Sequence, residues 1–483
     1  MKLPAAYLEE MRLLLGETEY ENYRKSMEEE SVLGLRFNSL KVSGAEREPV
    51  LHKVLAGKAE ELVPWSLGEG YYYKTGGRER TPDVGGSPGK HPYHYAGLYY
   101  LQEPSAMAPA AMFSIEPGDK VLDLCAAPGG KSTALGAGLL GTGLLLSNDR
   151  SVSRAKGLLK NIERFEIGNC LVTAEEPGRL AACFPEYFDK VLVDAPCSGE
   201  GMFRRDASMA SDWEARGPEY YGPIQRELLL LASRMVKPGG RLLYSTCTFS
   251  EWEDEGAVQW LLREAPSMES VALPAEHGFV RGKDGISVRL FPWKLKGEGH
   301  FLSLFQKKGC ETSDGTWADG RSGHRHGEGE GAGRDKRNGI FLERRKAFAE
   351  FCKKILVPLE ERGYYWERDG ELYLLPVDPE ELPPLRYLRT GLHLGTMKRE
   401  RFEPSQALAM YLKKEEFAST VDFPWEDMRT VKYLKGETIT EDGAFCTGED
   451  GWCLVCTDGW PLGFAKRGKG ILKNKYDAGW RWI

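Results

Sequence analysis

Between residues 118 and 306, short apolar runs alternate with helical segments, and this alternation constrains the fold more than any other feature of the sequence. The apolar runs predict strands at 121–125, 143–149, 169–173, 188–196 and 240–249. Helices are expected at 154–164 and around 224–235. Strands separated by helices at this spacing predict an α/β fold built on a doubly wound parallel sheet. A last pair of strands, near 286–292 and 300–306, is expected to close the domain.

Length and composition narrow the class of protein. The chain has 483 residues, which suggests about three domains at roughly 150 residues each. The net charge of −7 does not indicate nucleic-acid binding through bulk charge, although it is compatible with a local basic patch. No apolar run reaches the roughly 18 residues of a membrane helix, and the first residues do not resemble a signal peptide. We therefore expect a cytoplasmic protein without membrane contacts, whose ten cysteines are mostly free thiols.

Changes in composition divide the chain into five predicted segments. These are an N-terminal segment (1–105), the α/β domain (106–308), a flexible linker (309–338), an α+β module (339–425) and a strand-rich module (426–483). The linker is rich in Gly and charged residues and almost lacks aliphatic side chains. Its histidines, His324 and His326, are interpreted as solvated residues, and no metal site is predicted. The short strands and turns of the last module fit a small β-barrel.

The last 23 residues form a basic tail. Six basic side chains and one acidic side chain lie there: Lys466, Arg467, Lys469, Lys473, Lys475, Arg481 and Asp477. Trp460, Trp480 and Trp482 are interleaved with them or lie just before them. Positive charge combined with aromatic rings favours a surface that binds RNA. The alternative is a solvated basic tail whose tryptophans belong to a core.

The segment 123–131, Asp-Leu-Cys-Ala-Ala-Pro-Gly-Gly-Lys, follows one strand and opens a helix. Ligands of open α/β sheets bind at the carboxyl ends of strands, and two glycines allow close approach of the backbone. The dinucleotide fingerprint is absent, and a phosphate-binding P-loop is disfavoured because Cys125 stands where that motif has Gly. Asp149 ends the next strand, where it is expected to bind ribose hydroxyls or to cap a helix. An adenosine cofactor such as S-adenosylmethionine is therefore favoured.

Two cysteines end neighbouring strands on the same side of the predicted sheet. Cys197 lies in Asp-Ala-Pro-Cys-Ser-Gly, and Cys247 lies in Ser-Thr-Cys-Thr. A single buried cysteine is usually structural, but a matched pair beside Asp194 indicates function. A thiolate that adds to carbon 6 of cytosine activates carbon 5 for methylation, and the second thiol could assist release of the product. Asp194 is expected to stabilise charge at ring nitrogen 3.

At these residues the chain resembles the Sun family of RNA cytosine carbon-5 methyltransferases. The matching stretches are VLDLCAAPGGK (121–131), the strand end at Asp149, DAPCSGEGMFRRD (194–206), YSTCTFSEWEDE (244–255) and RLFPWKLKGEGHFLSLF (289–305). LRFNSLK (35–41) is similar to the family's N-terminal RNA-binding segment. The tail at 433–437 and 459–481 is similar to a PUA-like RNA-binding domain. The two-module tail, 339–425 and 426–483, resembles that of the RsmF-like branch, whose members methylate 16S ribosomal RNA.

The resemblance implies a Rossmann-like methyltransferase sheet and a role for each matching residue. Cys247 is implied as the nucleophile, Cys197 as the release thiol, and Asp194 as a contact of both the target base and the cofactor. S-adenosylmethionine is expected to contact Cys125, Ala126, Ala127, Pro128, Gly129, Gly130, Lys131, Asp149 and Asp194. Where the family has an Asp after the third strand, this chain has Ala174-Glu175, so Glu175 is expected at the adenine.

Three alternatives stay open at this point. A DNA cytosine methyltransferase would use the Pro-Cys thiol as nucleophile, and the additional Thr-Cys speaks against it. The other two hypotheses are an enzyme that methylates tRNA cytosine and a non-catalytic RNA-binding assembly factor. A redox or zinc role for Cys453 and Cys456 is disfavoured, because residues three apart in a strand point to opposite faces. The expected partner is 16S ribosomal RNA within the small subunit or an assembly intermediate, bound by a monomer.

Overall fold

Each strand predicted between 118 and 306 is present in the structure, a computed structural model that describes residues 3–55, 61–73, 87–309, 328–441 and 443–482, without the side chains of 328–333. The strands are β4 (Lys120–Asp123), β5 (Leu144–Asn148), β6 (Cys170–Thr173), β7 (Phe188–Asp194), β8 (Val236–Thr246), β9 (Met268–Val271), β10 (Val280–Arg281), β11 (Val288–Leu290) and β12 (His300–Lys307). The helices are α4 (Ala108–Met112), α5 (Gly130–Gly138), α6 (Val152–Arg164), α7 (Pro177–Cys183), α8 (Ser208–Ala215), α9 (Gly217–Met235) and α10 (Glu255–Glu264).

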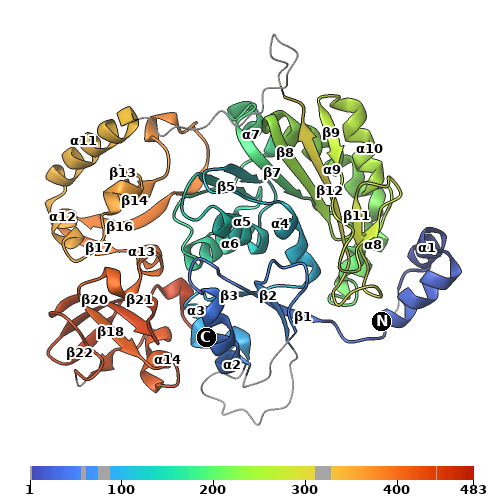
Figure 1. The fold of residues 1–483 in the computed structure, drawn as a ribbon. Helices are drawn as coiled ribbons and strands as arrows, with labels where there is room; N and C mark the ends of the chain where they lie inside the picture. Colours follow the sequence, from blue (N-terminus) through green and yellow to red (C-terminus); the bar gives the residue numbers. More distant parts are fainter. Residues whose placement is uncertain (1–2, 56–60, 74–86, 310–327, 442, 483) are drawn as a thin grey trace.

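These strands form the central sheet, which has ten strands among the described residues (Figure 1). Its path runs β10-β11-β12-β8-β7-β4-β5-β6-β15, where β15 (Tyr387–Thr390) comes from a later module, and β9 pairs with β12. The five strands from β8 to β6 in this path are parallel, which confirms the doubly wound α/β fold. The chain leaves β4 toward β5 on one side and later returns to β7 on the other. Ligands of such sheets bind at the carboxyl ends of the strands beside this reversal.

The apolar strands form because both faces of the sheet are covered by helices. In β5, Leu145 packs in the core on one face, whereas Leu144 and Leu146 pack in the core on the other. Val121 and Leu122 of β4 divide between the two cores in the same way. Strands buried on both faces are continuous apolar runs rather than alternating ones. Each fully buried leucine contributes on the order of 2 kcal/mol of transfer free energy.

The N-terminal segment has its own small sheet. Its elements are α1 (Ala5–Ser26), β1 (Leu33–Phe37), α2 (Gly44–Val54), β2 (Gly70–Tyr73), α3 (Pro92–Tyr95) and β3 (Tyr99–Leu101). The three strands are antiparallel in the order β2-β1-β3. Helix α1 is kinked at Gly16, whose positive φ of 72° breaks the helical path. Figure 1 shows α1 beside α8, and buried residues of both helices share one aromatic cluster.

The module after the linker departs from the predicted boundaries. Its elements are α11 (Glu328–Arg344), α12 (Lys346–Cys352), β13 (Tyr364–Arg368), β14 (Glu371–Leu375), β15 (Tyr387–Thr390), β16 (Leu392–Lys398), β17 (Arg401–Pro404) and α13 (Gln406–Tyr411). Residues 328–338 are helical, so the linker prediction of 309–338 is wrong for that part, while His324 and His326 lie outside the described residues. Among the described residues, strand β15 does not pair within its own module. It pairs antiparallel with β6 and so extends the central sheet.

The last module is a five-stranded sheet among the described residues. It comprises β18 (Thr420–Phe423), α14 (Met428–Leu434), β19 (Ile439–Thr440), β20 (Gly451–Thr457), β21 (Trp460–Gly468) and β22 (Ile471–Asn474), with strand order β18-β20-β21-β22-β19. Because β18 pairs with β20, the module begins before the predicted residue 426. One hydrophobic core joins it to the N-terminal segment, since Phe37 and Tyr99 pack there with Phe423 and Tyr433. In the described part of the chain, no helix has the length and apolar character needed to cross a bilayer.

Candidate active site

The two predicted cysteines meet at the carboxyl ends of neighbouring strands. Asp194 of β7 lies beside Ser245 of β8 in the parallel register, and each strand is followed within three residues by its cysteine. The Sγ atoms of Cys197 and Cys247 are 3.3 Å apart, and the backbone N–H of Cys247 donates to Cys197 Sγ at 3.4 Å. Both cysteines are free thiols. The expectation that the two sulfurs lie close together is confirmed.

The surroundings of Cys197 keep its proton in place. The hydrogen bond with Cys247 and the burial of the side chain raise the pKa of Cys197 well above its ordinary value. A thiol with a raised pKa is a poor nucleophile at neutral pH but remains a hydrogen-bond donor. Cys197 is therefore suited to donate a hydrogen bond.

A buried carboxylate braces the loop that carries Cys197. Glu253 accepts two hydrogen bonds from Ser198, one from its backbone N–H at 3.0 Å and one from its hydroxyl at 2.5 Å. It accepts a third from Gln225 Nε2 at 2.7 Å. Burial raises the pKa of Glu253 to about 7. The Ser198 hydroxyl also lies 2.7 Å from Thr248 Oγ1, so the residues after both cysteines are tied to each other. This network fixes the separation of the two sulfurs.

An ion pair between Lys131 and Asp194 connects the cofactor loop to the strand end that precedes Cys197. Lys131 Nζ donates to Asp194 Oδ2 at 2.8 Å, and Ser245 Oγ donates to Asp194 Oδ1 at 2.8 Å. Burial alone would lower the pKa of Lys131, but the charge and hydrogen bond of Asp194 outweigh it and raise that pKa. The Asp194 side chain keeps 30% of its surface exposed, so it is accessible to a bound base. The predicted residues Lys131 and Asp194 are thus brought together beside Cys197 and Cys247.

The predicted cofactor loop, Cys125 to Lys131, turns sharply between β4 and α5. Gly129 has a φ of +110°, a conformation that L side chains rarely adopt, and it is the residue before the first turn of α5. Two side chains from α6 hold the loop, since Arg154 donates to the carbonyl of Ala127 at 2.9 Å and Asn161 to that of Pro128 at 2.8 Å. The free N–H groups of the α5 N-terminus then face the strand ends.

Sequence reasoning missed Asp123, the last residue of β4. Its side chain is fully buried, accepts a hydrogen bond from Ser132 Oγ at 2.6 Å, and has one carboxylate oxygen without a partner in the described structure. Burial raises the pKa of Asp123 to about 7. A buried carboxylate oxygen without a partner, beside a glycine turn and a helix N-terminus, fits the ammonium group of an amino-acid moiety. The residues present therefore fit S-adenosylmethionine.

Asp149 and Glu175 lie at the ends of the next two strands. Asp149 Oδ1 accepts the backbone N–H of Ser151 at 2.9 Å, and Asp149 Oδ2 is 3.3 Å from Arg154. The cap of α6 is Ser151, so Asp149 is not itself the helix cap. Glu175 Oε1 accepts the backbone N–H of Arg386 at 2.5 Å and lies 3.6 Å from Arg179. Its carboxylate is therefore engaged with the module that follows the linker.

The tryptophans of the basic tail have intramolecular partners, which corrects part of the RNA-surface prediction. Trp480 is 5% exposed and belongs to the core shared with the N-terminal segment. The Arg164 guanidinium lies 5.5 Å from its ring centre. Trp482 stacks on Tyr95 with ring centres 5.3 Å apart. The predicted stacking surface is wrong for Trp480, because burial of this ring stabilises the fold, whereas Lys473 and Lys475 are exposed.

Cys453 and Cys456 are buried in β20 and face different cores. Cys453 packs in the core shared with the N-terminal segment, and Cys456 packs with the module of α12 and β13. The prediction that they point to opposite faces is confirmed. In the part of the chain that the structure covers, no group of three or more His, Cys, Asp or Glu residues could hold a metal ion.

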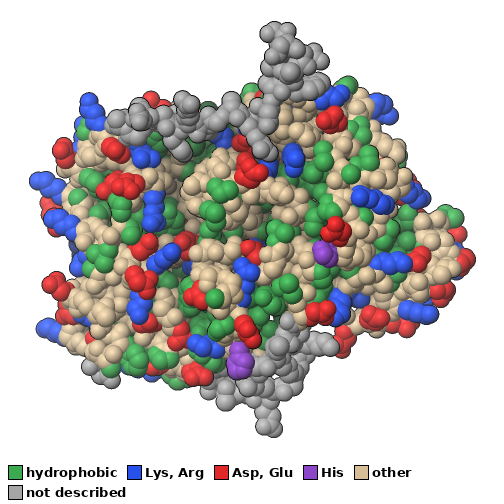
Figure 2. Space-filling model, in the orientation of Figure 1, with side chains coloured by type: hydrophobic (Ala, Val, Ile, Leu, Met, Phe, Trp, Pro, Cys, Tyr) green, Lys and Arg blue, Asp and Glu red, His purple; other side chains and the backbone are tan. Residues whose placement is uncertain are grey.

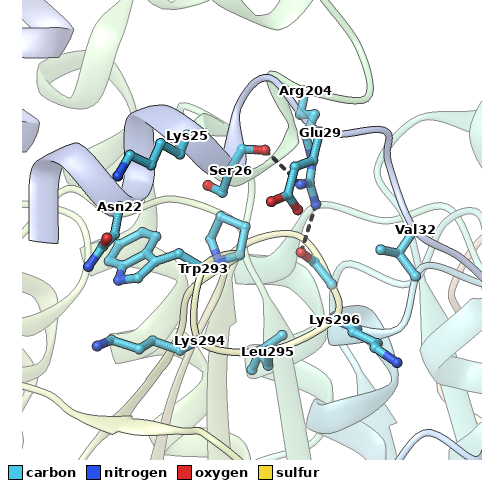
Figure 3. Close-up of a pocket in the computed structure, with 12 residues that line it drawn as sticks. Asn22, Lys25, Ser26, Glu29, Val32, Arg204, Trp293, Lys294, Leu295 and Lys296 are labelled. Carbon is cyan, nitrogen blue, oxygen red and sulfur yellow. Dashed lines mark hydrogen bonds between the residues drawn. The ribbon is translucent and has the colours of Figure 1, made fainter.

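A pocket of about 570 Å³ lies between the end of α1 and the segment 292–297 (Figure 3). Lys25, Lys294 and Lys296 lie around it in Figure 3, and Arg204 forms part of its wall. Arg204 donates to the carbonyls of Ser26 and Gly297, both at 2.9 Å, and is 3.0 Å from Glu298. Arg204 therefore ties α1 to the loop of Cys197. On the face drawn in Figure 2, basic side chains are interspersed with acidic ones.

The fold and this constellation define a Rossmann-like methyltransferase with a pair of thiols. Family models match the chain in four stretches. Residues 110–306 match 16S rRNA methyltransferase RsmB/F, 3–104 the N-terminal domain of 16S rRNA methyltransferase RsmF, 350–412 the RsmF rRNA methyltransferase first C-terminal domain, and 420–482 the methyltransferase RsmF PUA domain. The expected methyltransferase sheet and PUA-like module are thus confirmed.

Curated relatives match along nearly the whole chain. Ribosomal RNA small subunit methyltransferase F of Klebsiella pneumoniae (strain 342) is 31% identical over 98% of this chain and 95% of its own length. The protein of the same name from Pectobacterium atrosepticum is 30% identical over 98% and 94%. The chain belongs to the ribosomal RNA small subunit methyltransferase F family. It is an S-adenosylmethionine-dependent methyltransferase.

Two solved structures agree with this fold over 63% of the chain. A methyltransferase homolog protein from Pyrococcus horikoshii is 26% identical, with a TM-score of 0.50 over 63% of this chain and 100% of that chain. NSun6 from Pyrococcus horikoshii is 22% identical, with a TM-score of 0.54 over 63% of this chain and 98% of that chain, and this likeness concerns the fold alone.

Proposed function

We propose that the chain methylates carbon 5 of cytosine in 16S ribosomal RNA, using S-adenosylmethionine, through a covalent bond between Cys247 and the base. The observation that carries this proposal is the 3.3 Å contact between Cys197 and Cys247 beside the Lys131–Asp194 pair. It combines a nucleophile, a second thiol and a charged pair that can contact the pyrimidine ring. The small-subunit ribosomal RNA named for the relatives supports the choice of substrate. The proposed enzyme acts as a monomer in the cytoplasm, on the small subunit or an assembly intermediate.

In the first step, the Cys247 thiolate adds to carbon 6 of the flipped cytosine, and electron density moves to carbon 5. The S–H of Cys197 is proposed to hold the thiolate with a hydrogen bond before the attack. Lys131 is proposed to direct its positive charge to ring nitrogen 3, where negative charge develops, and Asp194 is proposed to hold this ammonium group beside the base. S-adenosylmethionine, when bound, supplies an electrophilic methyl group to carbon 5.

In the second step, water in the site accepts the proton of carbon 5, the electrons of that C–H bond restore the double bond between carbons 5 and 6, and the bond between Cys247 and carbon 6 breaks. The Cys247 sulfur leaves as a thiolate, and the protonated Cys197 donates a hydrogen bond to it. The raised pKa of Cys197 supports this role, because the thiol still carries its proton at neutral pH. Without Cys197, the departing thiolate would lose its nearest donor, so release would slow more than attack.

The proposed cofactor residues are the loop from Cys125 to Lys131, with Asp149 at the ribose and Asp194 near the methyl group. The buried carboxylate oxygen of Asp123 that lacks a partner supports adding this residue to the site. Glu175 is kept as a proposed adenine contact, although its carboxylate already accepts the N–H of Arg386.

Bisulfite sequencing of ribosomal RNA from cells with and without the gene tests this function. The proposal predicts at least one cytosine in 16S RNA that resists conversion only when the gene is present. Restoring the wild-type gene should bring the protection back, and restoring the Cys247→Ala variant should not. Protected cytosines confined to tRNA would favour tRNA as the substrate. Identical profiles in all strains, with purified chain that does not bind S-adenosylmethionine, would favour a non-catalytic assembly factor.

A further inference from the structure

Arg36 connects the N-terminal segment to the cofactor loop. It lies on β1, and only 3% of its surface is exposed. Its Nη2 atom donates to the carbonyl of Gly130 at 3.0 Å and to the Thr133 hydroxyl at 2.7 Å. The Thr133 hydroxyl also donates to the Gly130 carbonyl at 3.1 Å, so the three groups close a small ring of hydrogen bonds. The first turn of α5, where the cofactor loop ends, is thus held by a side chain from another module.

The N-terminal segment also fixes the direction of the guanidinium. Arg36 Nε donates to Gln102 Oε1 at 2.9 Å, and Gln102 Nε2 donates to the carbonyl of Ala106 at 2.9 Å. The carboxylate of Glu69 lies 4.0 Å from Arg36 Nη1. Burial lowers the pKa of Arg36, but an arginine remains protonated in proteins. The hydrogen bonds to the loop are therefore charge-assisted and directional.

The loop packs directly on this segment as well. A Cβ atom built on Gly130 would lie 3.3 Å from Gln102 Nε2 and 3.3 Å from the Tyr100 ring, so little space separates the two modules. Three loop carbonyls accept side-chain donors: Ala127 from Arg154, Pro128 from Asn161, and Gly130 from Arg36. The first two donors lie on α6 of the same domain. Arg36 is the donor among these three that a movement of the N-terminal segment would displace.

We propose that Arg36 is a positioning residue of the cofactor loop, through which RNA bound to the N-terminal segment tightens cofactor binding. The part about RNA rests on the proposed function, because it requires this segment to contact the substrate. Coupling between two ligands is reciprocal, so the cofactor must tighten RNA binding by the same factor. The enzyme would then favour the ternary complex over either binary complex.

The first test uses Arg36→Lys, with Arg47→Lys as the matched control. Lysine keeps the charge, but one ammonium cannot reproduce the geometry that joins Gln102, Gly130 and Thr133. Arg47 lies in the same segment and donates to the carbonyl of Gly68 at 2.5 Å, which belongs to the segment itself. Titration calorimetry without RNA measures the Kd for S-adenosylmethionine. Hydrogen exchange of residues 125–133 in the cofactor-free protein gives a readout that does not depend on activity.

We expect the Kd to rise about tenfold for Arg36→Lys, the loss of roughly one charge-assisted hydrogen bond, and the loop amides to exchange faster. Arg47→Lys should match the wild type in both measurements. A Kd within about twofold of wild type, with unchanged exchange at 125–133, would overturn the positioning role. Exchange that accelerates equally throughout the sheet of β4 and β5 would also overturn it, since the effect would then be general destabilisation.

The second test measures the coupling itself. The Kd of S-adenosylhomocysteine, which cannot donate a methyl group, is measured with and without a saturating transcript of 16S ribosomal RNA. RNA should tighten binding by a factor of about five or more in the wild type and in Arg47→Lys, and by a smaller factor in Arg36→Lys. An RNA factor of one in the wild type would overturn the coupling and leave the proposed reaction intact. Absence of any cofactor binding by the wild type would overturn the proposed function as well.

Discussion

Cys197 and Cys247 meet sulfur to sulfur at 3.3 Å, although 50 residues separate them in the chain. The meeting follows from the parallel pairing of β7 and β8, which end at the same edge of the sheet. The hydrogen bond with Cys247, together with burial, raises the pKa of Cys197, so this thiol keeps its proton at neutral pH. In the proposed reaction, Cys197 donates a hydrogen bond and Cys247 attacks the base.

Replacing the nucleophile should abolish methyl transfer. For Cys247→Ala we expect the rate to fall by at least about a thousandfold, as when a covalent nucleophile is removed from other enzymes. Transfer of a labelled methyl group from S-adenosylmethionine to RNA measures the rate, and binding of the cofactor should be unchanged. Cys183→Ala is the matched control, because this half-buried thiol lies on α7 away from the paired cysteines. Equal loss in both variants would refute the assignment of Cys247.

Breaking the Lys131–Asp194 pair should slow the chemical step. Asp194→Asn keeps the shape of the side chain but removes the charge that Lys131 and Ser245 contact. We expect kcat to fall by about a hundredfold or more, in the range seen when one transition-state contact is removed. Asp189→Asn is a suitable comparison, since Asp189 pairs with Lys237 at the opposite end of the strands. An unchanged kcat in Asp194→Asn would show that this carboxylate does not act on the ring.

Protonation of Glu253 should contribute to the pH dependence of stability. Burial raises its pKa to about 7 in the folded protein, above the ordinary value of 4.5. A raised carboxyl pKa means that the folded state binds the proton more tightly than the unfolded state. The stabilising contribution is therefore present below pH 4.5 and is lost as the pH rises through about 7.

The measurement is the Tm of the wild type and of Glu253→Gln at pH 5 and pH 8. The glutamine variant cannot titrate, so its Tm should fall less between the two pH values. Glu251→Gln is the control, because Glu251 is a neighbouring residue at the surface that pairs with Lys283. If the wild type and Glu253→Gln lose the same number of degrees, the assigned pKa is wrong.

Substitutions of the buried tryptophan and of the exposed lysines in the basic tail should have different effects on stability and on RNA binding. Trp480→Ala removes a buried ring from the core shared with the N-terminal segment, and should cost about 3–5 kcal/mol in the free energy of unfolding. The paired change Lys473→Ala and Lys475→Ala removes exposed charge and should leave stability within about 0.5 kcal/mol. RNA affinity of the lysine variant should fall and its salt dependence should weaken. Unchanged RNA binding at low salt would remove these lysines from the RNA surface.

Much of the central sheet could be predicted because its strands are buried on both faces. From the continuous apolar runs and the turns that follow them, the sequence predicts Cys197, Cys247 and Lys131 at the carboxyl ends of the parallel strands. The position of β15 could not be predicted in this way. The segment 387–390 is short and weakly apolar. It forms a strand because the edge of β6 offers unpaired backbone groups.

Asp123 of the site and Trp480 of the basic tail illustrate what local sequence patterns do not contain. Asp123 is a single polar residue at the end of an apolar run, and its role depends on the loop turning back so that Ser132 donates to it. The sequence around Trp480 is compatible with a ring that stacks on RNA and equally with a ring that packs in a core. Its ring lies beside Arg164, which is more than 300 residues away in the chain, and packs in a core shared with the N-terminal segment. No pattern near residue 480 contains that information.

The most direct test of the central claim is a denaturing gel of the Cys197→Ala variant after incubation with 16S RNA and S-adenosylmethionine. The account predicts a protein–RNA adduct that survives denaturation, because Cys247 still attacks but its release is slowed. The double variant Cys197→Ala with Cys247→Ala should give no adduct, and the wild type should give little. An adduct that persists without Cys247, or the absence of an adduct from a Cys197→Ala protein that binds both ligands, would contradict the account.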